Sequence, residues 1–190
     1  MASQIKVNEI LKQSGSNLTL GESGTTVKLG SGVTAGDGLG VINQVVTTAK
    51  TDTTSTTSSS FVDISGMTLD IEPIATTSKV LIMVQTWVCG GSTANQPINL
   101  LRDSTVIGVA DTSADYTIPF RQSDDGQNQY RMFNLTTTFV DSPSTSSSTT
   151  YKLQWKTNSG TLYLNRTVNE GGLGTGVNAC STITALEVLA

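Results

Sequence analysis

The sequence predicts an all-β protein, and three observations support this. Its 190 residues include 31 Thr and 22 Ser; Thr favours half-buried pleated surfaces, whereas Ser and Gly favour turns. Residues typical of helices are sparse after the first dozen positions. Short segments of alternating apolar and polar residues recur between polar turns. About eight to eleven such segments from residue 41 onward predict a jelly-roll-like β-sandwich, with an immunoglobulin-like sandwich as the alternative.

The expected strands follow from this alternation, and the polar stretches between them, such as residues 51–60, are interpreted as loops. Apolar side chains on both faces of Val80–Val84 predict a central strand that is covered on both sides. We expect strands at about residues 41–49, 61–64, 67–71, 79–89, 98–102, 106–110, 116–120, 131–140, 151–157, 161–166 and 181–189.

The chain divides by composition into an anchor or stalk segment (1–34), a glycine-rich joint (35–40) and a β-sandwich head (41–190). A weak repeat, LTLG at Leu18–Gly21 and VKLG at Val27–Gly30, predicts two short strands in the stalk. Units this small are marginal in water, so we expect three copies of the chain to bury them together as a homotrimer. A tail that orders only on a larger particle is the alternative. The expected trimer and anchor interface comprises Ile5, Val7, Ile10, Leu18, Leu20, Val27, Leu29 and Val33.

Catalytic and metal-binding chemistry has little support in the sequence. The chain contains no His, which removes the usual activation of Ser or Cys nucleophiles and the commonest transition-metal ligand. Its two cysteines, Cys89 and Cys180, lack zinc-site spacing, and we expect both to be buried free thiols, with a disulfide formed after release from the cell as the alternative. We therefore expect no enzymatic activity, no cofactor and no metal site.

Charge and hydropathy exclude two classes of partner. The net charge is −4 and the eleven Lys and Arg residues are scattered singly, so no cationic face for nucleic acid is expected. The longest apolar stretch, Val80–Cys89, is about half the length of a membrane-spanning helix, and no secretory signal precedes it. We therefore expect a soluble chain that is made in a cytoplasm and does not insert into a membrane.

Several segments resemble a group of bacteriophage fibre and virion proteins that end in a small trimeric β head. The resemblance implies a homotrimeric virion component with an N-terminal docking or shaft segment and a C-terminal jelly roll. About 40 residues precede the head, and a fully extended chain of that length reaches about 130–140 Å at most. This length does not fit a free-standing long fibre and fits a short tail fibre, a tip carried by another protein, or a spike on the capsid. The segments that carry the resemblance are SKVLIMVQTWV (78–88), INLLRDSTVIG (98–108), FVDSPSTSSSTTYKLQWKT (139–157), LYLNR (162–166), STITALEVLA (181–190) and the opening SQIKVNEILKQSGSNLTLGESGTTVKLGSG (3–32).

The resemblance implies that the chain is a short tail fibre whose head binds the host surface, located on the virion and attached to other virion proteins through its N-terminus. A trimeric capsid decoration or cement protein is the alternative, and a cellular immunoglobulin-like adhesion module ranks far behind both. Amide, carboxylate and tyrosine side chains in loops can bind sugar hydroxyls or stack on a pyranose ring. A host-surface glycan or protein is the expected ligand. The expected receptor contacts are Asn95, Gln96, Asp115, Tyr116, Gln127, Asn128 and Tyr130.

Overall fold

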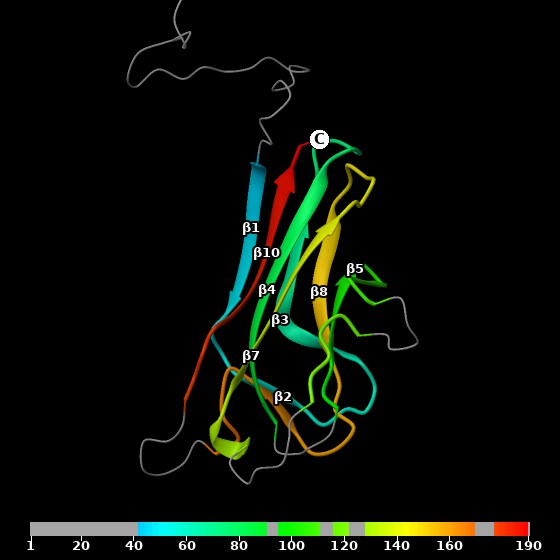
Figure 1. Ribbon diagram of the computed structural model, residues 1–190. Helices are drawn as coiled ribbons and strands as arrows, with labels where there is room; N and C mark the ends of the chain where they lie inside the picture. The colour runs from blue at the N-terminus through cyan, green and yellow to red at the C-terminus, as the bar shows by residue number, and fades with distance from the viewer. Residues whose placement is uncertain (1–41, 91–94, 111–115, 122–127, 170–176, 190) are drawn as a thin grey trace, which may run out of the picture. The chain divides into compact units, whose positions relative to one another are not determined.

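The computed structural model describes residues 42–90, 95–110, 116–121, 128–169 and 177–189 (Figure 1). The chain separates into two compact units, residues 1–36 and 37–190, and every described residue belongs to the second. The expected stalk (1–34) and joint (35–40) therefore lie outside the described residues.

The head is an all-β sandwich, as the alternation of apolar and polar residues predicts. Sheet A has the order β1-β10-β4-β9-β2, with β7 also paired to β4, and sheet B has the order β3-β8-β5-β6. All named pairings are antiparallel, and the chain crosses between the sheets after most strands, as in jelly rolls. The strands are β1 (Ile42–Lys50), β2 (Thr54–Thr56), β3 (Val62–Ile71), β4 (Lys79–Gly90), β5 (Ile98–Arg102), β6 (Thr105–Ile107), β7 (Phe133–Asp141), β8 (Thr149–Trp155), β9 (Leu162–Leu164) and β10 (Ser181–Val188).

The core lies between the two sheets and consists of the inward-facing residues of each strand. In β8, Tyr151 and Leu153 are fully buried and Trp155 nearly so, while the residues between them are half-buried. In β10, Ile183 and Ala185 are likewise fully buried. This period of two places one apolar row of each strand in the core.

The sandwich has two distinct ends. At the end where β1 begins, Ile42 pairs with Val188 and Val188 with Lys79; we call this the proximal end. At the opposite, distal end, Gly90 of β4 pairs with Leu162 of β9. The 12 residues of β4 span about 36–40 Å at about 3.3 Å per residue, so the two ends present separate surfaces.

Two strand predictions differ from the structure because local features were misread. The predicted strands 61–64 and 67–71 form one strand, β3, whose register shifts between Asp63 and Thr68. Gly66 has a φ of 79° within this shift, so the interruption is a β-bulge rather than a loop. The polar stretch 51–60 contains β2, whose Thr residues pair with β9.

Two further predictions are wrong. The predicted strand 116–120 contributes one isolated bridge, from Ile118 to Ile98, because Pro119 has no N–H to donate to a ladder. Among the described residues, the centre of β4 is covered on its inner face only. Val80, Ile82 and Val84 are buried, but Met83 is 47 % exposed on the outer face.

Candidate functional site

The distal end brings together segments that are far apart in the sequence. Asn95 forms an isolated antiparallel bridge with Arg121, and the Gln96 N–H donates to the Phe120 carbonyl at 2.8 Å. The Asn158 N–H donates to the Asn95 carbonyl at 3.2 Å. Three connections of the sandwich are therefore joined into one surface.

A cation–aromatic cluster adjoins this surface, and we define it as Phe61, Tyr116 and Lys156. Phe61 precedes β3, Lys156 follows β8, and Tyr116 lies before the Ile118 bridge. The two ring centroids are 6.0 Å apart with planes inclined by 53°. The Lys156 Nζ lies 4.8 Å from the Phe61 centroid and 5.2 Å from that of Tyr116, within the range of cation–π attraction.

Backbone contacts fix the cluster beside the distal loops. The Lys156 N–H donates to the Pro97 carbonyl at 3.4 Å, so the chain after β8 runs alongside residues 95–97. All three side chains of the cluster are half-buried, and each therefore keeps a solvent-facing part. A shallow groove of about 400 Å³ adjoins it, lined by Gly108, Val109, Ala110, Tyr116, Thr117 and Pro119.

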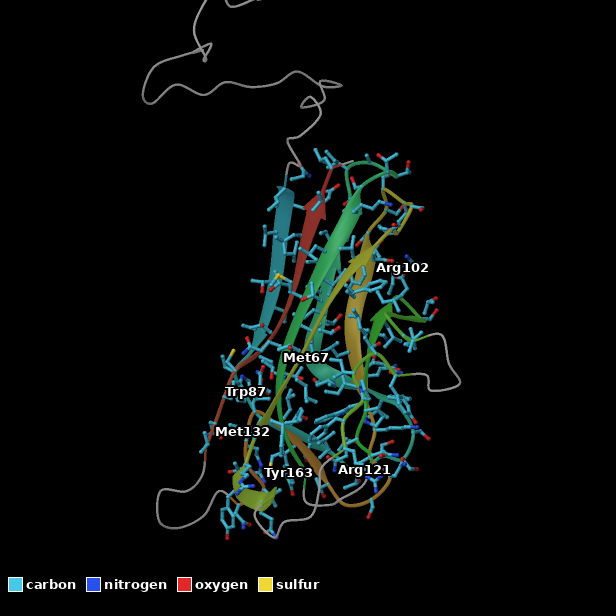
Figure 2. The ribbon with its side chains drawn as sticks, viewed as in Figure 1. Met67, Trp87, Arg102, Arg121, Met132 and Tyr163 are labelled. Atoms are coloured by element: carbon cyan, nitrogen blue, oxygen red, sulfur yellow. The ribbon has the colours of Figure 1, made fainter. Side chains whose placement is uncertain are left out.

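A second cation–aromatic pair lies at the same end. The Arg166 guanidinium carbon is 4.4 Å from the centroid of the Tyr163 ring. Figure 2 shows Tyr163 and Arg121 at the distal end and Arg102 much nearer the proximal end. Flat rings beside cations form a surface that can bind sugar rings and acidic groups together.

The proximal end has a different character. Glu187, fully buried in β10, accepts hydrogen bonds from Asn43 Nδ2 (2.8 Å), Gln44 Nε2 (2.7 Å) and the Ile74 N–H (2.8 Å). Burial alone would raise the pKa of Glu187, but these hydrogen bonds, together with polar contact from Ser78, outweigh it and lower the pKa. The carboxylate thus ties the start of β1 to β10 and to the β3–β4 loop.

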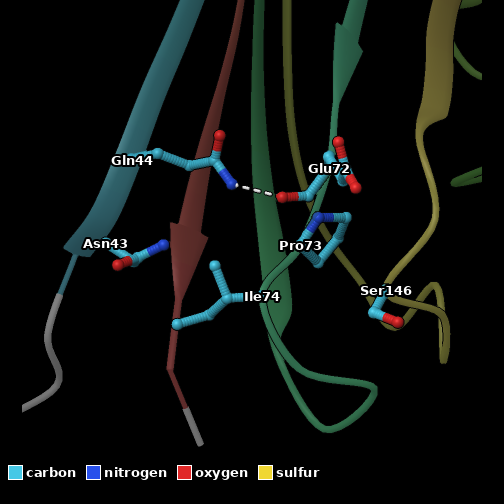
Figure 3. Close-up of a pocket in the computed structure, with 6 residues that line it drawn as sticks. All are labelled: Asn43, Gln44, Glu72, Pro73, Ile74 and Ser146. Atoms are coloured by element: carbon cyan, nitrogen blue, oxygen red, sulfur yellow. Dashed lines mark hydrogen bonds between the residues drawn. The ribbon is translucent and has the colours of Figure 1, made fainter. Parts of the chain in front are cut away.

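An open hollow of about 590 Å³ lies at this proximal end (Figure 3). Gln44 Nε2 also donates to the Glu72 carbonyl at 2.7 Å, which joins two residues of its lining. Asn43, Gln44 and Ile74 are in addition held by Glu187, so we assign the hollow a structural role at the proximal end. Its lining comprises Asn43, Gln44, Glu72, Pro73, Ile74 and Ser146.

One predicted receptor contact is wrong. Gln96 is fully buried, and its amide lies directly over Gly90, with its Cδ 2.8 Å from the position that a Cβ on Gly90 would take. Its side chain therefore packs inside the distal end instead of facing a ligand. The expectation that both thiols are buried is also wrong, since Cys89 is buried but Cys180 is exposed; neither of the two forms a disulfide bond.

The other predicted receptor contacts divide into four groups. Asn95 and Tyr130 are exposed at the distal end, Tyr130 by 46 %. Tyr116 belongs to the cation–aromatic cluster. Asn128 begins the short 3-10 helix Asn128–Tyr130. Asp115, Gln127 and the anchor residues Ile5, Val7, Ile10, Leu18, Leu20, Val27, Leu29 and Val33 lie outside the described residues.

The sequence did not indicate several residues of this surface, among them Phe61, Lys156 and Arg121. Phe61 and Lys156 are separated by 94 intervening positions, and only the pairing of Val62 with Trp155 makes them neighbours. Arg121 directly precedes the loop in which amide side chains and Tyr130 were the expected contacts. An apolar or cationic residue immediately outside a strand end is the signal that could have indicated all three.

The described residues show neither a metal-binding cluster nor a membrane-spanning helix. Across the described ranges, no three Asp, Glu or Cys side chains group closely enough to hold a metal ion. In the part of the chain with assigned structure, no helix has the length and apolar character needed to cross a membrane.

Comparisons with known proteins give structural likeness without a match in sequence. No protein-family model and no curated protein matches the sequence. The chain is similar to a chain in the structure of the infectious bursal disease virus Gx strain, with a TM-score of 0.39 and 14 % sequence identity. The match covers 87 % of this chain and 42 % of that chain. The assignment of the sandwich therefore rests on its own strand pairing.

Proposed function

We propose that the chain is a bacteriophage virion protein, a short tail fibre whose head binds a host-surface ligand with its distal end. One observation carries this proposal: the ring-bearing and cationic side chains gather at the end opposite the start of β1. The segment that precedes Ile42 leads into the proximal end, so an anchor there leaves the distal surface facing outward. The sequence resemblance to phage fibre and virion proteins supports the same arrangement.

The chemistry of the distal end favours a glycan with acidic groups. Tyr116 and Phe61 offer ring faces, Lys156 supplies an ammonium group between them, and Tyr130 adds a further exposed ring. Sugar C–H faces pack on aromatic rings, while carboxylate or phosphate substituents attract the cation. Asn95 can both donate to and accept from sugar hydroxyls.

An adsorption assay tests this function. Fluorescently labelled full-length protein is incubated with cells of the bacterium that the phage infects, and binding is measured with and without competing virions. We expect saturable binding, competition with virions, and a several-fold loss of binding in Lys156→Gln. Lys79→Gln is the matched control, because Lys79 lies at the proximal end and its Nζ bonds to Ser142 Oγ at 2.8 Å.

The results separate the two virion roles. Binding of the wild type that Lys156→Gln weakens and Lys79→Gln leaves intact supports the adhesive head. Absence of binding to cells contradicts it and favours the capsid decoration alternative. Replacing Leu18 and Leu20 with Asp should reduce incorporation into virions in either case, because both roles attach the protein through its N-terminal segment.

A further inference from the structure

The outer face of sheet A carries an apolar band across four strands. The register aligns Val45 with Leu186, Leu186 with Leu81, and Leu81 with Val140. The two outer members, Val45 and Val140, are 58 % and 57 % exposed. The two central leucines are half-buried between them. Each strand thus contributes one apolar side chain to a continuous row.

The band widens on both sides of this row. Ile42, at the proximal end of β1, is 54 % exposed, and Met83, on the next outward position of β4, is 47 % exposed. Val188 pairs with both Ile42 and Lys79 and lies between them. Single exposed apolar residues are ordinary, but a contiguous patch marks an interaction surface.

The polar residues of this face are self-complementary. Thr47 aligns with Thr184, Thr184 with Met83, and Met83 with Thr138, and the Oγ1 atoms of Thr47 and Thr184 are 2.8 Å apart. The next positions of β4 and β7, Gln85 and Thr136, are also paired. A hydroxyl or amide both donates and accepts, so each of these side chains can bond to a copy of itself.

The scarcity of charged residues on this face favours contact with a second copy of the chain. Among its described residues only Lys79, at the proximal margin, carries a charge, although the whole chain has a net charge of −4. Contacts between copies bring like side chains near a symmetry axis, where charged residues would repel. Four adjacent strands span about 19 Å across the sheet, and eight residues span about 26 Å along a strand. A contact between two such faces buries about 1,000 Å², the lower bound for a specific interface.

We propose that copies of this chain associate through the outer face of sheet A, with the row Val45–Leu186–Leu81–Val140 at the centre of the contact. The association holds the heads together directly, in addition to any contact between the N-terminal segments. It does not depend on whether the protein is located on the tail or on the capsid.

The test measures oxidation of Met83 in the full-length protein by hydrogen peroxide, followed by mass spectrometry across a concentration series. Light scattering on the same samples gives the mass of the assembly. We expect Met83 to oxidise several-fold more slowly in the assembled protein than after dilution to the monomer. Met67, which is fully buried, serves as the internal reference for an intact fold.

Paired variants assign the protection to this face. Val45→Lys with Val140→Lys should abolish the protection of Met83 and shift the assembly toward lower mass. Ile74→Lys with Val109→Lys is the matched control, since Ile74 and Val109 are 63 % and 42 % exposed elsewhere and the charge change is identical. If the first pair unfolds, Val45→Thr with Val140→Thr keeps the β-branched shape and should weaken protection in the same direction.

Three results would overturn the proposal. The first is a wild-type protein that stays monomeric at every concentration. The second is Met83 oxidation as fast in the assembly as in the diluted monomer. The third is protection that persists in the diluted monomer, which would mean that another part of the same chain covers the face.

Discussion

The phenol of Tyr151 in sheet B donates a 2.7 Å hydrogen bond to Oδ2 of Asp141 in sheet A. Arg102 completes the contact, because its Nη1 lies 2.9 Å from both carboxylate oxygens of Asp141. Asp141 is 6 % exposed and Tyr151 is fully buried. The proximal half of the sandwich is therefore joined across its layers by a charged hydrogen-bond network whose buried groups are paired.

Tyr151→Phe should lower the free energy of unfolding by about 1.5–3 kcal/mol, the range for a hydrogen bond to a charged group. Urea denaturation at neutral pH measures this. Val62→Ala, at a 38 % exposed position of β3, is the control for a routine loss of surface contact. A Tyr151→Phe protein as stable as the wild type would contradict the account.

The alkaline titration of tyrosine should show the same contact. Burial, and next the hydrogen bond to Asp141, raise the pKa of Tyr151 far above its ordinary value near 10. Because the folded-state pKa is raised, this contribution to stability is complete below about pH 10 and is lost as the pH rises above it. Absorbance near 295 nm should report one tyrosine fewer ionised at pH 11 in the native wild type than in the unfolded protein. Equal titration in both states would exclude a buried phenol.

Glu187→Gln should destabilise the proximal end at neutral pH by about 1.5–3 kcal/mol, since the amide loses charge-assisted hydrogen bonds. The pKa of Glu187 is lowered in the fold, so its contribution is present above its ordinary pKa near 4.5 and is lost as the pH falls through the lowered value. The difference between wild type and variant in urea denaturation should therefore shrink from pH 7 to pH 3. Glu72→Gln changes an exposed carboxylate in the loop between β3 and β4. It should leave the dependence of stability on pH the same as in the wild type. A difference in unfolding free energy between wild type and Glu187→Gln that stays constant from pH 7 to pH 3 would refute the role of the Glu187 carboxylate.

Gly90→Ala should destabilise the head by about 1–3 kcal/mol through overpacking, because the new Cβ would fall on the side-chain amide of Gln96. The double variant Gly90→Ala with Gln96→Ala removes the obstructing amide. It should therefore cost less than the sum of the two single variants in thermal unfolding. If the destabilisations of the two single variants simply add in the double variant, a Cβ at position 90 does not contact the Gln96 side chain.

Thiol reactivity should separate the two cysteines. Cys180 is exposed and Cys89 is buried. Burial raises the pKa of the Cys89 thiol, against smaller opposing contributions from backbone groups of Val168 and Arg131, so little thiolate forms there. Ellman's reagent should titrate one thiol in the native protein and two in guanidinium chloride, and Cys180→Ser should abolish the native reaction. Two fast native thiols would contradict the structure.

Most strands could be predicted because apolar and polar residues alternate clearly along them. The predicted range 98–102 coincides with β5, and β10 ends within a residue of its predicted limit, since each has a row of buried side chains. The bulge at Gly66 and strand β2 escaped prediction because tertiary pairing decides both. β2 has no apolar pattern of its own, and its place follows from the pairing of Thr54 with Leu164.

The candidate site could be predicted only as a set of loops. The sequence indicates that residues around Asn95 and Tyr130 lie outside strands, but not which side chains turn inward, so Gln96 was assigned to the wrong side of the surface. The cluster of Phe61 and Lys156 depends on the register between β3 and β8. The apolar stretch Val80–Val84 predicts two covered faces, but among the described residues the outer face of β4 stays partly open, with Met83 47 % exposed.

Immunogold labelling of intact virions with antibodies against the head tests the central claim most directly. We expect gold on the particles, at the tail, and we expect antibodies that bind the distal loops to block adsorption to host cells. Gold confined to the capsid would contradict the fibre assignment, and virions without any gold would contradict the virion role altogether.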